Sequence, residues 1–136
     1  MHTNIDNIFF SVNPAVSNDD LNALFASAWG WPQDLHNDFQ PMLERSIAYT
    51  CAYCSERLIG FVNLAWDGGF HTFISEAVVH QDFQRRGIGS QLVRQAIDVA
   101  RHKKVKWVHV DYEPHLQNFY QNCGFYPTSA GLIKFE

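Results

Sequence analysis

The sequence predicts a domain of the α/β (α+β) class, in which a central mixed sheet is covered by helices on both faces. Short runs rich in β-branched and aromatic residues recur through the middle and the last third of the chain, which is typical of strands. Residues 87–102 carry apolar side chains at helical spacing. The expected order is helices, then three strands in hairpin succession, the third of which begins a run of strand, helix, strand, helix and strand. This order requires both antiparallel and parallel neighbours in one sheet.

Length and composition are those of one globular domain, which we expect to span residues 1–136. The 136 residues are 46% hydrophobic and 15% aromatic, which supports a core and argues against disorder. A net charge of −4 gives no general attraction to nucleic acid or to an anionic membrane. We find neither an apolar run long enough to span a bilayer nor a basic leader followed by an apolar run. A cytoplasmic protein without a nucleic-acid or membrane partner is therefore expected.

The N-terminal third is predicted to hold two helices. After the apolar stretch at 8–12, Ser17 can cap a helix over "NDDLNALFASAW", and "GWP" ends it. Its apolar stripe consists of Leu21, Leu24, Phe25 and Ala28. A second, short helix is expected within residues 37–46, where Pro41 limits the position at which it begins.

Three strands are predicted next, joined by tight turns. They read "IAYTCAYC" (47–54), "LIGFVNLAW" (58–66) and "FHTFISEAVVH" (70–80). The polar turn "SER" joins the first two, and "DGG" joins the second to the third. Such short connections favour antiparallel hairpins.

The last third is predicted to begin with the helix at 87–102. One face of this helix is apolar and consists of Ile88, Leu92, Val93, Ala96, Ile97 and Ala100. A buried strand, "VKWVHVDY" (105–112), follows the helix. A short helix is then opened by Pro114 and stopped by Gly124, and "AGLIKFE" (130–136) closes the chain as another strand.

Cysteine spacing does not indicate a metal site. Cys51 and Cys54 lie three residues apart in a predicted strand, so their side chains should point to opposite faces of the sheet. Only Cys123 is left to join them, and no second pair completes a zinc site. We expect reduced thiols in small, buried or half-buried side chains, and no metal.

The glycine pair in "HQDFQRRGIGSQL" (80–92) suggests an anion site. Gly87 and Gly89 stand where a helix begins, so unpaired amide N–H groups and the helix dipole favour negative charge there. A Walker loop would need Gly-Lys-Ser/Thr, which is absent. A dinucleotide fingerprint would need a third glycine or alanine and a first glycine directly after the strand. The remaining interpretation is a pyrophosphate held by residues 84–89.

The string "QRRGIG" (84–89) resembles the coenzyme A signature Gln/Arg-x-x-Gly-x-Gly/Ala of the GNAT superfamily of N-acetyltransferases. "NFYQNCGFYP" (118–127) resembles the closing motif of that family, and "WDGGFHTFISEAVVH" (66–80) is similar to a group of small bacterial members. The resemblance covers essentially the whole chain in element order. It implies a GNAT fold, in which a mostly antiparallel mixed sheet has one splayed parallel strand pair, and acetyl-CoA as the acyl donor.

The resemblance also assigns residues to the coenzyme. The pyrophosphate would be held mainly through backbone amides of Gln84, Arg85, Arg86, Gly87, Ile88, Gly89 and Ser90. Ala77, Val78 and Val79 would offer backbone groups to the pantetheine arm, and the Val79 N–H would polarise the thioester carbonyl. The simpler alternative is that this strand is merely buried. Gln81 and Glu113 stand where many members have Pro and Asn, and we do not expect Glu113 to contact phosphate.

Acid and base roles come from the same resemblance. Tyr120 matches the general acid that protonates the departing thiolate, and the alternative is a core aromatic side chain. Glu76, three residues before Val79, could take the proton of the amine directly or through water. His80, His109 and Asp111 compete with it. A lone carboxylate on a strand is more often solvated or ion-paired.

The acceptor is expected to enter between the N-terminal helices and the two central strands. The connecting segment carries Trp29, Trp31, Asp34, His36, Asp38 and Phe39, which could receive a cationic amine or simply pack the helices. The expected activity is acetyl transfer from acetyl-CoA to a primary amine of a small molecule or peptide, in a ternary complex. The alternatives are a catalytically silent acyl-CoA-binding module and a nucleic-acid-modifying enzyme. A monomer or a homodimer is expected.

Overall fold

A computed structural model describes residues 7–135. Its strands are β1 (Ile8–Val12), β2 (Ser46–Cys54), β3 (Arg57–Trp66), β4 (His71–Val79) and β5 (Trp107–His109). Its helices are α1 (Asn18–Trp29), α2 (Gln40–Glu44), α3 (Ile88–His102) and α4 (Gln117–Asn122), with short 3-10 helices at Gln81–Phe83 and Pro114–Leu116. These elements form the mixed α/β architecture that the sequence predicts.

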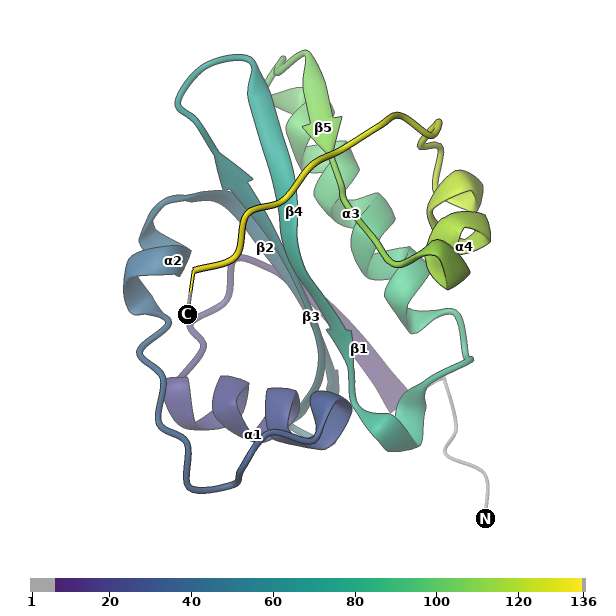
Figure 1. The fold of residues 1–136 in the computed structure, drawn as a ribbon. Helices are drawn as coiled ribbons and strands as arrows, with labels where there is room; N and C mark the ends of the chain where they lie inside the picture. The colour runs from purple at the N-terminus through teal and green to yellow at the C-terminus, as the bar shows by residue number, and fades with distance from the viewer. Residues whose placement is uncertain (1–6, 136) are drawn as a thin grey trace.

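The five strands form one sheet in the order β1-β2-β3-β4-β5 (Figure 1). The first four pair antiparallel with their neighbours. β5 runs parallel to β4, because α3 carries the chain back along the sheet between them, as parallel pairing requires. The sheet is therefore mixed and mostly antiparallel.

Two hydrophobic cores lie on opposite faces of the sheet. On one face, α3 buries Leu92, Val93 and Ala96 completely. On the other, α1 buries Leu21 and Phe25 completely. Helices thus cover both faces, as Figure 1 shows, and this confirms the layer arrangement expected from the sequence.

Close packing of α3 on the sheet depends on Gly60 of β3. A Cβ atom at this position would lie 2.8 Å from Leu92 Cδ1 and 3.3 Å from the Ala52 side chain. Any larger residue would push α3 away from the strands. Gly60 therefore helps to set the position of the helix whose first turn is the predicted anion site.

The structure confirms the residues predicted to begin and end α1, and it confirms the opposite orientations predicted for Cys51 and Cys54. The Ser17 Oγ accepts a hydrogen bond from the Asp20 N–H at 3.1 Å, and Gly30 ends the helix in the left-handed conformation at φ 69°. Cys51 packs in the core on the α1 side, whereas Cys54 packs against the α3 side. The two thiols therefore point to opposite faces.

Strand predictions at the ends of the chain need correction. The stretch "IFFSV", left unassigned above, forms β1 and pairs with β2. The predicted buried strand at 105–112 shrinks to Trp107–His109, with Trp107 49% exposed. The predicted closing strand at 130–136 is wrong for its described part, because residues 130–135 form no strand. β5 is short because no strand pairs with its outer edge, so nothing holds that part of the chain in a regular ladder.

Within residues 7–135, we find no helix of the length and apolar character needed to cross a membrane. The same residues contain no group of three or more His, Cys, Asp or Glu side chains that could hold a metal ion.

Candidate functional site

The parallel strands β4 and β5 separate after a short paired stretch. Their register pairs His71 with Trp107, Thr72 with Val108 and Phe73 with His109, and no further pair follows. From residue 74 to residue 79, β4 has no partner on its β5 side. This half of β4 therefore presents backbone groups to an opening in the sheet, in agreement with the predicted splayed strand pair.

Pairing with β3 decides which of these backbone groups face the opening. The His80 N–H donates to the Ile59 carbonyl at 2.7 Å, and bonded and non-bonded pairs alternate along an antiparallel ladder. This alternation directs the backbone of Val78 toward β3. It directs the N–H and C=O groups of Ala77 and Val79 toward the opening, where polar groups need a partner. The Gln84 side chain occupies the Val79 carbonyl, so Ala77 and the N–H of Val79 are the predicted pantetheine positions that face the opening.

A side-chain hydrogen bond joins the loop between β4 and α3 to the end of β4. The Gln84 Nε2 donates to the Val79 carbonyl at 3.0 Å, so this side chain holds the loop against the opening. Arg85 and Gly87 both have left-handed backbone, with φ of 65° and 79°. Such alternation of backbone conformation turns successive N–H groups toward one side and makes a concave anion site.

The first turn of α3 presents unpaired amides. Gly87 is its N-cap residue and provides no side-chain acceptor. The Ser90 Oγ donates to the Gly87 carbonyl at 3.1 Å, and within residues 7–135 no side chain caps the N–H groups of Ile88, Gly89 and Ser90. These amides and the helix dipole favour an oxygen anion, as the sequence predicts for this position.

Only one of the two glycines is required by the local structure. Gly87 lies in the left-handed region, where an L side chain is strained, although a Cβ there would meet nothing within 4 Å. A Cβ at Gly89 would lie 3.5 Å from Phe119 Cζ and 3.5 Å from Val79 Cγ2. These are ordinary contact distances, so an alanine would fit at position 89, and a steric need for glycine is seen only in the left-handed backbone of Gly87.

Two arginines flank these amides from the surface. Arg85 is exposed, whereas Arg86 is half-buried, with its guanidinium 5.6 Å from the centre of the Phe83 ring. Both positive charges stand beside the predicted anion site, where they add to the field of the helix N-terminus.

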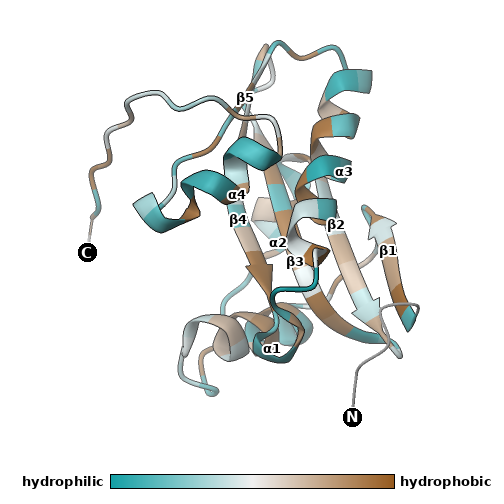
Figure 2. Ribbon diagram, turned by 90° about the vertical axis from the view of Figure 1, so that its right-hand side faces the viewer, coloured by the Kyte–Doolittle hydropathy of each residue, from teal (hydrophilic) through white to brown (hydrophobic). Residues whose placement is uncertain are grey.

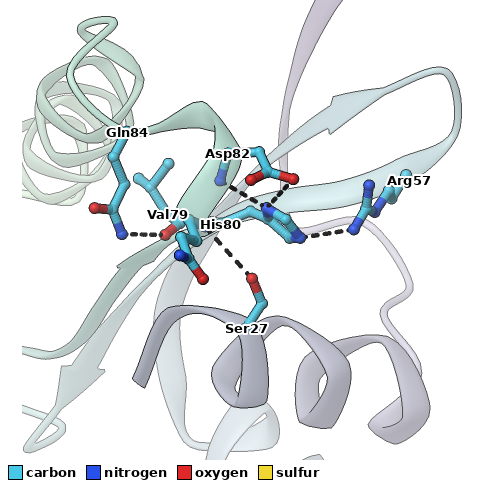
Figure 3. A network of polar contacts seen from close by, with 7 residues as sticks. Ser27, Arg57, Val79, His80, Asp82 and Gln84 are labelled. Atoms are coloured by element: carbon cyan, nitrogen blue, oxygen red, sulfur yellow. Dashed lines mark hydrogen bonds and ion pairs between the residues drawn. The ribbon is translucent and has the colours of Figure 1, made fainter. Parts of the chain in front are cut away.

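His80 occupies a structural position (Figure 3). The ring is buried; its Nδ1 lies 3.0 Å from the Asp82 backbone nitrogen, and its Nε2 lies 2.6 Å from an Arg57 guanidinium nitrogen. Burial and then the Arg57 charge lower the pKa of His80, against a smaller opposing effect of Asp82. The Gln81 N–H donates to the Ser27 Oγ at 3.4 Å and links this loop to α1. These contacts favour a role in fixing the loop.

A cleft of about 560 Å³ lies beside the splayed half of β4. Its lining includes Glu76, Asp111, Glu113 and Tyr120, together with Trp29 from the far helix. Among the described residues that line it, there is no lysine, arginine or histidine. The cleft therefore combines three carboxylates with aromatic surface.

Glu76 is the carboxylate best suited to accept a proton. It lies on β4, three residues before Val79, and burial raises its pKa from 4.5 to about 7. A base is most effective when its pKa lies near the working pH. Asp111 also lines the cleft, whereas His80 and His109 are absent from its described lining. His109 instead lies 2.7 Å from the His71 ring.

Tyr120 is buried in the core and also borders the cleft. It is 5% exposed and packs among aromatic rings, stacked on Tyr112 at 5.0 Å and edge-on to Phe119 at 4.9 Å. It nevertheless lines the cleft. Burial, and secondarily Cys123 and Asp111, raise the pKa of Tyr120 to about 12, so the phenol carries its proton at neutral pH. The sequence alone did not indicate that Tyr112 stacks on the Tyr120 ring and holds it in place.

The aromatic cluster near α1 is mainly structural. Trp29, Trp31 and Phe39 pack around the Phe25 ring at centroid distances of 4.7, 5.2 and 5.2 Å. Asp38 accepts hydrogen bonds from Asn18 and from the Gln40 N–H. Within this cluster, only Trp29 is found among the described residues that line the cleft. The helix-packing interpretation therefore accounts for most of these side chains.

A family model for the acetyltransferase (GNAT) family matches residues 16–125. The chain belongs to the GNAT family of acetyltransferases. This confirms the family predicted from "QRRGIG" and "NFYQNCGFYP", and with it a transferase activity. The match covers α1 through α4, but not the segment after α4, of which Pro127, Thr128, Ala130 and Leu132 line the cleft.

Curated relatives of this GNAT chain are named as acetyltransferases. An uncharacterised N-acetyltransferase ycf52 of Gracilaria tenuistipitata var. liui is 28% identical over 94% of this chain and 72% of its own length. The ycf52 protein of Porphyra purpurea is 33% identical over 57% of this chain, and that match spans 45% of its own length. A mycothiol acetyltransferase of Mycolicibacterium vanbaalenii is 44% identical over 42% of this chain but only 19% of its own length.

Solved structures agree on the fold. A GNAT family protein of Streptococcus pneumoniae TIGR4 superposes with a TM-score of 0.77 at 24% identity, over 95% of this chain and 98% of its own. The aminoglycoside N-acetyltransferase AAC(6')-Iy in complex with CoA has a TM-score of 0.70 at 20% identity, over 95% and 94% of the two chains. At these identities the likeness supports the GNAT fold.

Proposed function

We propose that this chain is an acetyl-CoA-dependent N-acetyltransferase that acts on a primary amine by direct transfer in a ternary complex. The observation that carries the proposal is that Glu76 and Tyr120 line one cleft beside the splayed half of β4. Val79 follows Glu76 by three residues on the same strand, and its N–H is directed toward the side that β5 leaves open. Polarising a carbonyl, removing a proton and supplying a proton are the three needs of acyl transfer from a thioester to an amine.

The donor fits the free backbone groups. The unpaired amides at the start of α3 would hold its pyrophosphate, with Arg85 and Arg86 adding positive charge. Ala77 and Val79 would offer strand-like hydrogen bonds to the pantetheine amides. Gln84 would act indirectly, because its side chain is bound to the Val79 carbonyl.

The chemical step then uses three groups of this chain. Glu76 takes a proton from the bound ammonium group and releases it to water, and the neutral nitrogen attacks the thioester carbon. Glu76 then takes the second proton that the nitrogen must lose once the carbon–nitrogen bond has formed. The Val79 N–H donates to the carbonyl oxygen as negative charge develops there. The carbon–sulfur bond breaks, and Tyr120 gives its proton to the departing thiolate and regains one from water. No acetyl group is attached to the enzyme at any stage.

The acceptor is proposed to be a cationic amine. Three carboxylates and no basic side chain are found in the described lining of the cleft, so its field attracts positive charge. Trp29 and Tyr112 add aromatic faces, which bind cations favourably. AAC(6')-Iy, whose fold this chain shares, is named for aminoglycosides, which are amine substrates. A small polycationic amine or a basic peptide would suit the cleft.

A catalytically silent acyl-CoA-binding module is the second candidate. The deep burial and high pKa of Tyr120 favour it, because a phenol held in a core need not take part in chemistry. Both candidates require coenzyme binding, and they differ in turnover.

Acetyl-CoA binding is expected to depend on Gly87. Gly87→Ala should weaken binding at least tenfold, because the left-handed backbone that aims the amides costs an L residue about 1–2 kcal/mol. Gly68→Ala is the matched control. Gly68 also has a left-handed φ of 84° with no atom within 4 Å of a Cβ, but it lies in the β3–β4 turn. Titration calorimetry of both variants, beside thermal melting, separates binding from folding. Equal losses of affinity in the two variants would contradict the anion site.

A further inference from the structure

The pairing of β3 with β4 is irregular at one position. Leu64 pairs with Ile74. The next pair joins Asn63 to Glu76, which leaves Ser75 without a partner on β3. One extra residue of this kind is a β-bulge, which bends a strand and redirects the side chains that follow it. The bulge lies where β4 borders the cleft, just before the hydrophobic end of the strand (brown in Figure 2).

The bulge decides on which face of the sheet Glu76 lies. Side chains two residues apart on a regular strand share one face, so Ile74, Glu76 and Val78 would point the same way. Ile74 instead packs in the core on the α3 side of the sheet, whereas Val78 packs in the core on the α1 side. Glu76 follows the extra residue and lies two residues before Val78, so it shares the α1 side.

Asn63 is a buried polar residue that contacts the bulge directly. Its neighbours Val62 and Leu64 belong to the core on the α3 side, so its own side chain points to the α1 side. It is 0% exposed, and its Nδ2 donates to the Ser75 Oγ at 2.8 Å. Because a buried amide without a partner destabilises the fold, this bond favours the bulged strand over a regular one.

A second contact fixes the orientation of the Asn63 amide. The hydrogen of the Ser46 hydroxyl is shared between the Asn63 Oδ1 and the Met42 carbonyl, which lies 2.8 Å from the Ser46 Oγ. Met42 belongs to α2, and Ser46 begins β2. The Asn63 side chain is therefore held by α2 and β2 at one end, and it bonds to the bulge at the other. Rotation of the amide would break both contacts.

We propose that Asn63 is a positioning residue for Glu76. Its amide holds Ser75 as the extra residue of β4, and this keeps the Glu76 carboxyl in the cleft. The other titratable groups in the described lining of the cleft are Asp111, Glu113 and Tyr120. Asn63 is absent from that lining, so it acts through Glu76 and not on the acceptor. The role of Glu76 as a base rests on the proposed function, whereas its position can be measured without acetyl-CoA or an amine.

NMR titration of the Glu76 carboxyl carbon tests the proposal, with the signal assigned by its loss in Glu76→Gln. Burial raises the pKa of Glu76 to about 7 in the unmodified chain. In Asn63→Ala and in Ser75→Ala, the midpoint should fall by about one pH unit or more toward the ordinary value. The reason is that a loosened bulge lets water reach the carboxyl. Ser75 is exposed, so Ser75→Ala decides the question if Asn63→Ala fails to fold.

Thr50→Ala is the matched control. Thr50 is also 0% exposed, and its Oγ1 donates to the Leu92 carbonyl at 3.0 Å on the α3 side of the sheet. This variant loses a buried hydrogen bond away from the bulge, so Glu76 should still titrate at about 7. Ser75→Thr keeps the hydroxyl that accepts from Asn63 and should also leave the titration of Glu76 unchanged.

Three results would overturn the proposal. Glu76 of the unmodified chain could titrate near 4.5, which would mean that the carboxyl is not held in the cleft. Glu76 could titrate at about 7 in both Asn63→Ala and Ser75→Ala, which would mean that the amide does not position it. Thr50→Ala could lower the midpoint as much as Asn63→Ala does, which would mean that any weakening of the sheet has this effect.

Turnover gives an independent measurement with any amine that supports release of CoA. Asn63→Ala should lower kcat at least about tenfold, because a displaced base loses most of its contribution. The affinity for acetyl-CoA should stay within about twofold, since the amides at the start of α3 are unchanged. A normal kcat in Asn63→Ala would overturn the proposal. Absence of turnover in the unmodified chain would contradict the proposed function, while the NMR result would still decide the role of Asn63.

Discussion

Replacing Tyr120 with phenylalanine is expected to lower turnover by about 10²–10⁴, the usual effect of losing a positioned general acid. The change removes one oxygen and keeps the ring that stacks on Tyr112. Acetyl-CoA affinity and the melting temperature should therefore change little. In free energy, the loss corresponds to roughly 3–5 kcal/mol of transition-state stabilisation.

Tyr112→Phe is the matched control for this prediction. Tyr112 lines the same cleft and stacks on Tyr120, so its variant repeats the loss of a hydroxyl from the same aromatic pair. Its turnover should stay within about threefold of the unmodified chain, well short of the loss of a general acid. If the two variants lose activity equally, or if Tyr120→Phe keeps near-normal turnover, Tyr120 is a core residue and another group supplies the proton.

Glu76→Gln should give the second large effect, a fall of about 10²–10⁴ in kcat/KM. A base works only when it is deprotonated, and burial raises the pKa of Glu76 to about 7. Activity of the unmodified chain should therefore rise with pH through about 7, and this step should vanish in Glu76→Gln. Asp111→Asn is the control, since it removes another carboxylate of the cleft. If the rise of activity with pH persists in Glu76→Gln and disappears in Asp111→Asn, Asp111 is the general base.

The same carboxyl should make stability depend on pH. The pKa of Glu76 is about 7 in the folded chain, against an ordinary value of 4.5. Between these values the folded state holds a proton that the unfolded state has lost, so stability falls as pH rises through this window. Glu76→Gln cannot ionise and should lose less stability than the unmodified chain between pH 4.5 and pH 7. Melting temperatures of both proteins, measured across that pH range, test this direction. If the melting temperatures of the two proteins fall by the same amount as pH rises, the prediction is contradicted.

Much of the fold could be predicted because local chemistry agrees with the final structure. Ser17 caps α1 through its own Oγ, and the apolar face of α3 is the face that becomes buried. Gly87 marked the first turn of α3 because its left-handed backbone favours glycine. In each case the signal lies in residues that are close together in the sequence.

Features that depend on contacts between residues far apart in the sequence could not be predicted in this way. "AGLIKFE" has the composition of a strand, but strand pairing depends on contacts with residues far away in the sequence, and the described part of this segment is exposed and forms no strand. The burial of Tyr120 comes from Tyr112, Phe119 and Phe125 closing around it. His80 competed with Glu76 on sequence position alone, and only its contacts with Arg57 and Asp82 indicate a structural role.

The central claim is that this chain transfers acetyl groups to amines, and amine-dependent release of CoA tests it most directly. Purified protein is incubated with acetyl-CoA and a panel that includes polyamines, aminoglycosides, basic peptides and neutral monoamines, and free thiol is measured. We expect release that requires both the protein and a cationic amine, falls sharply in Tyr120→Phe, and yields an amine one acetyl group heavier by mass spectrometry. Tight acetyl-CoA binding without thiol release from any amine would contradict the claim and favour the silent binding module.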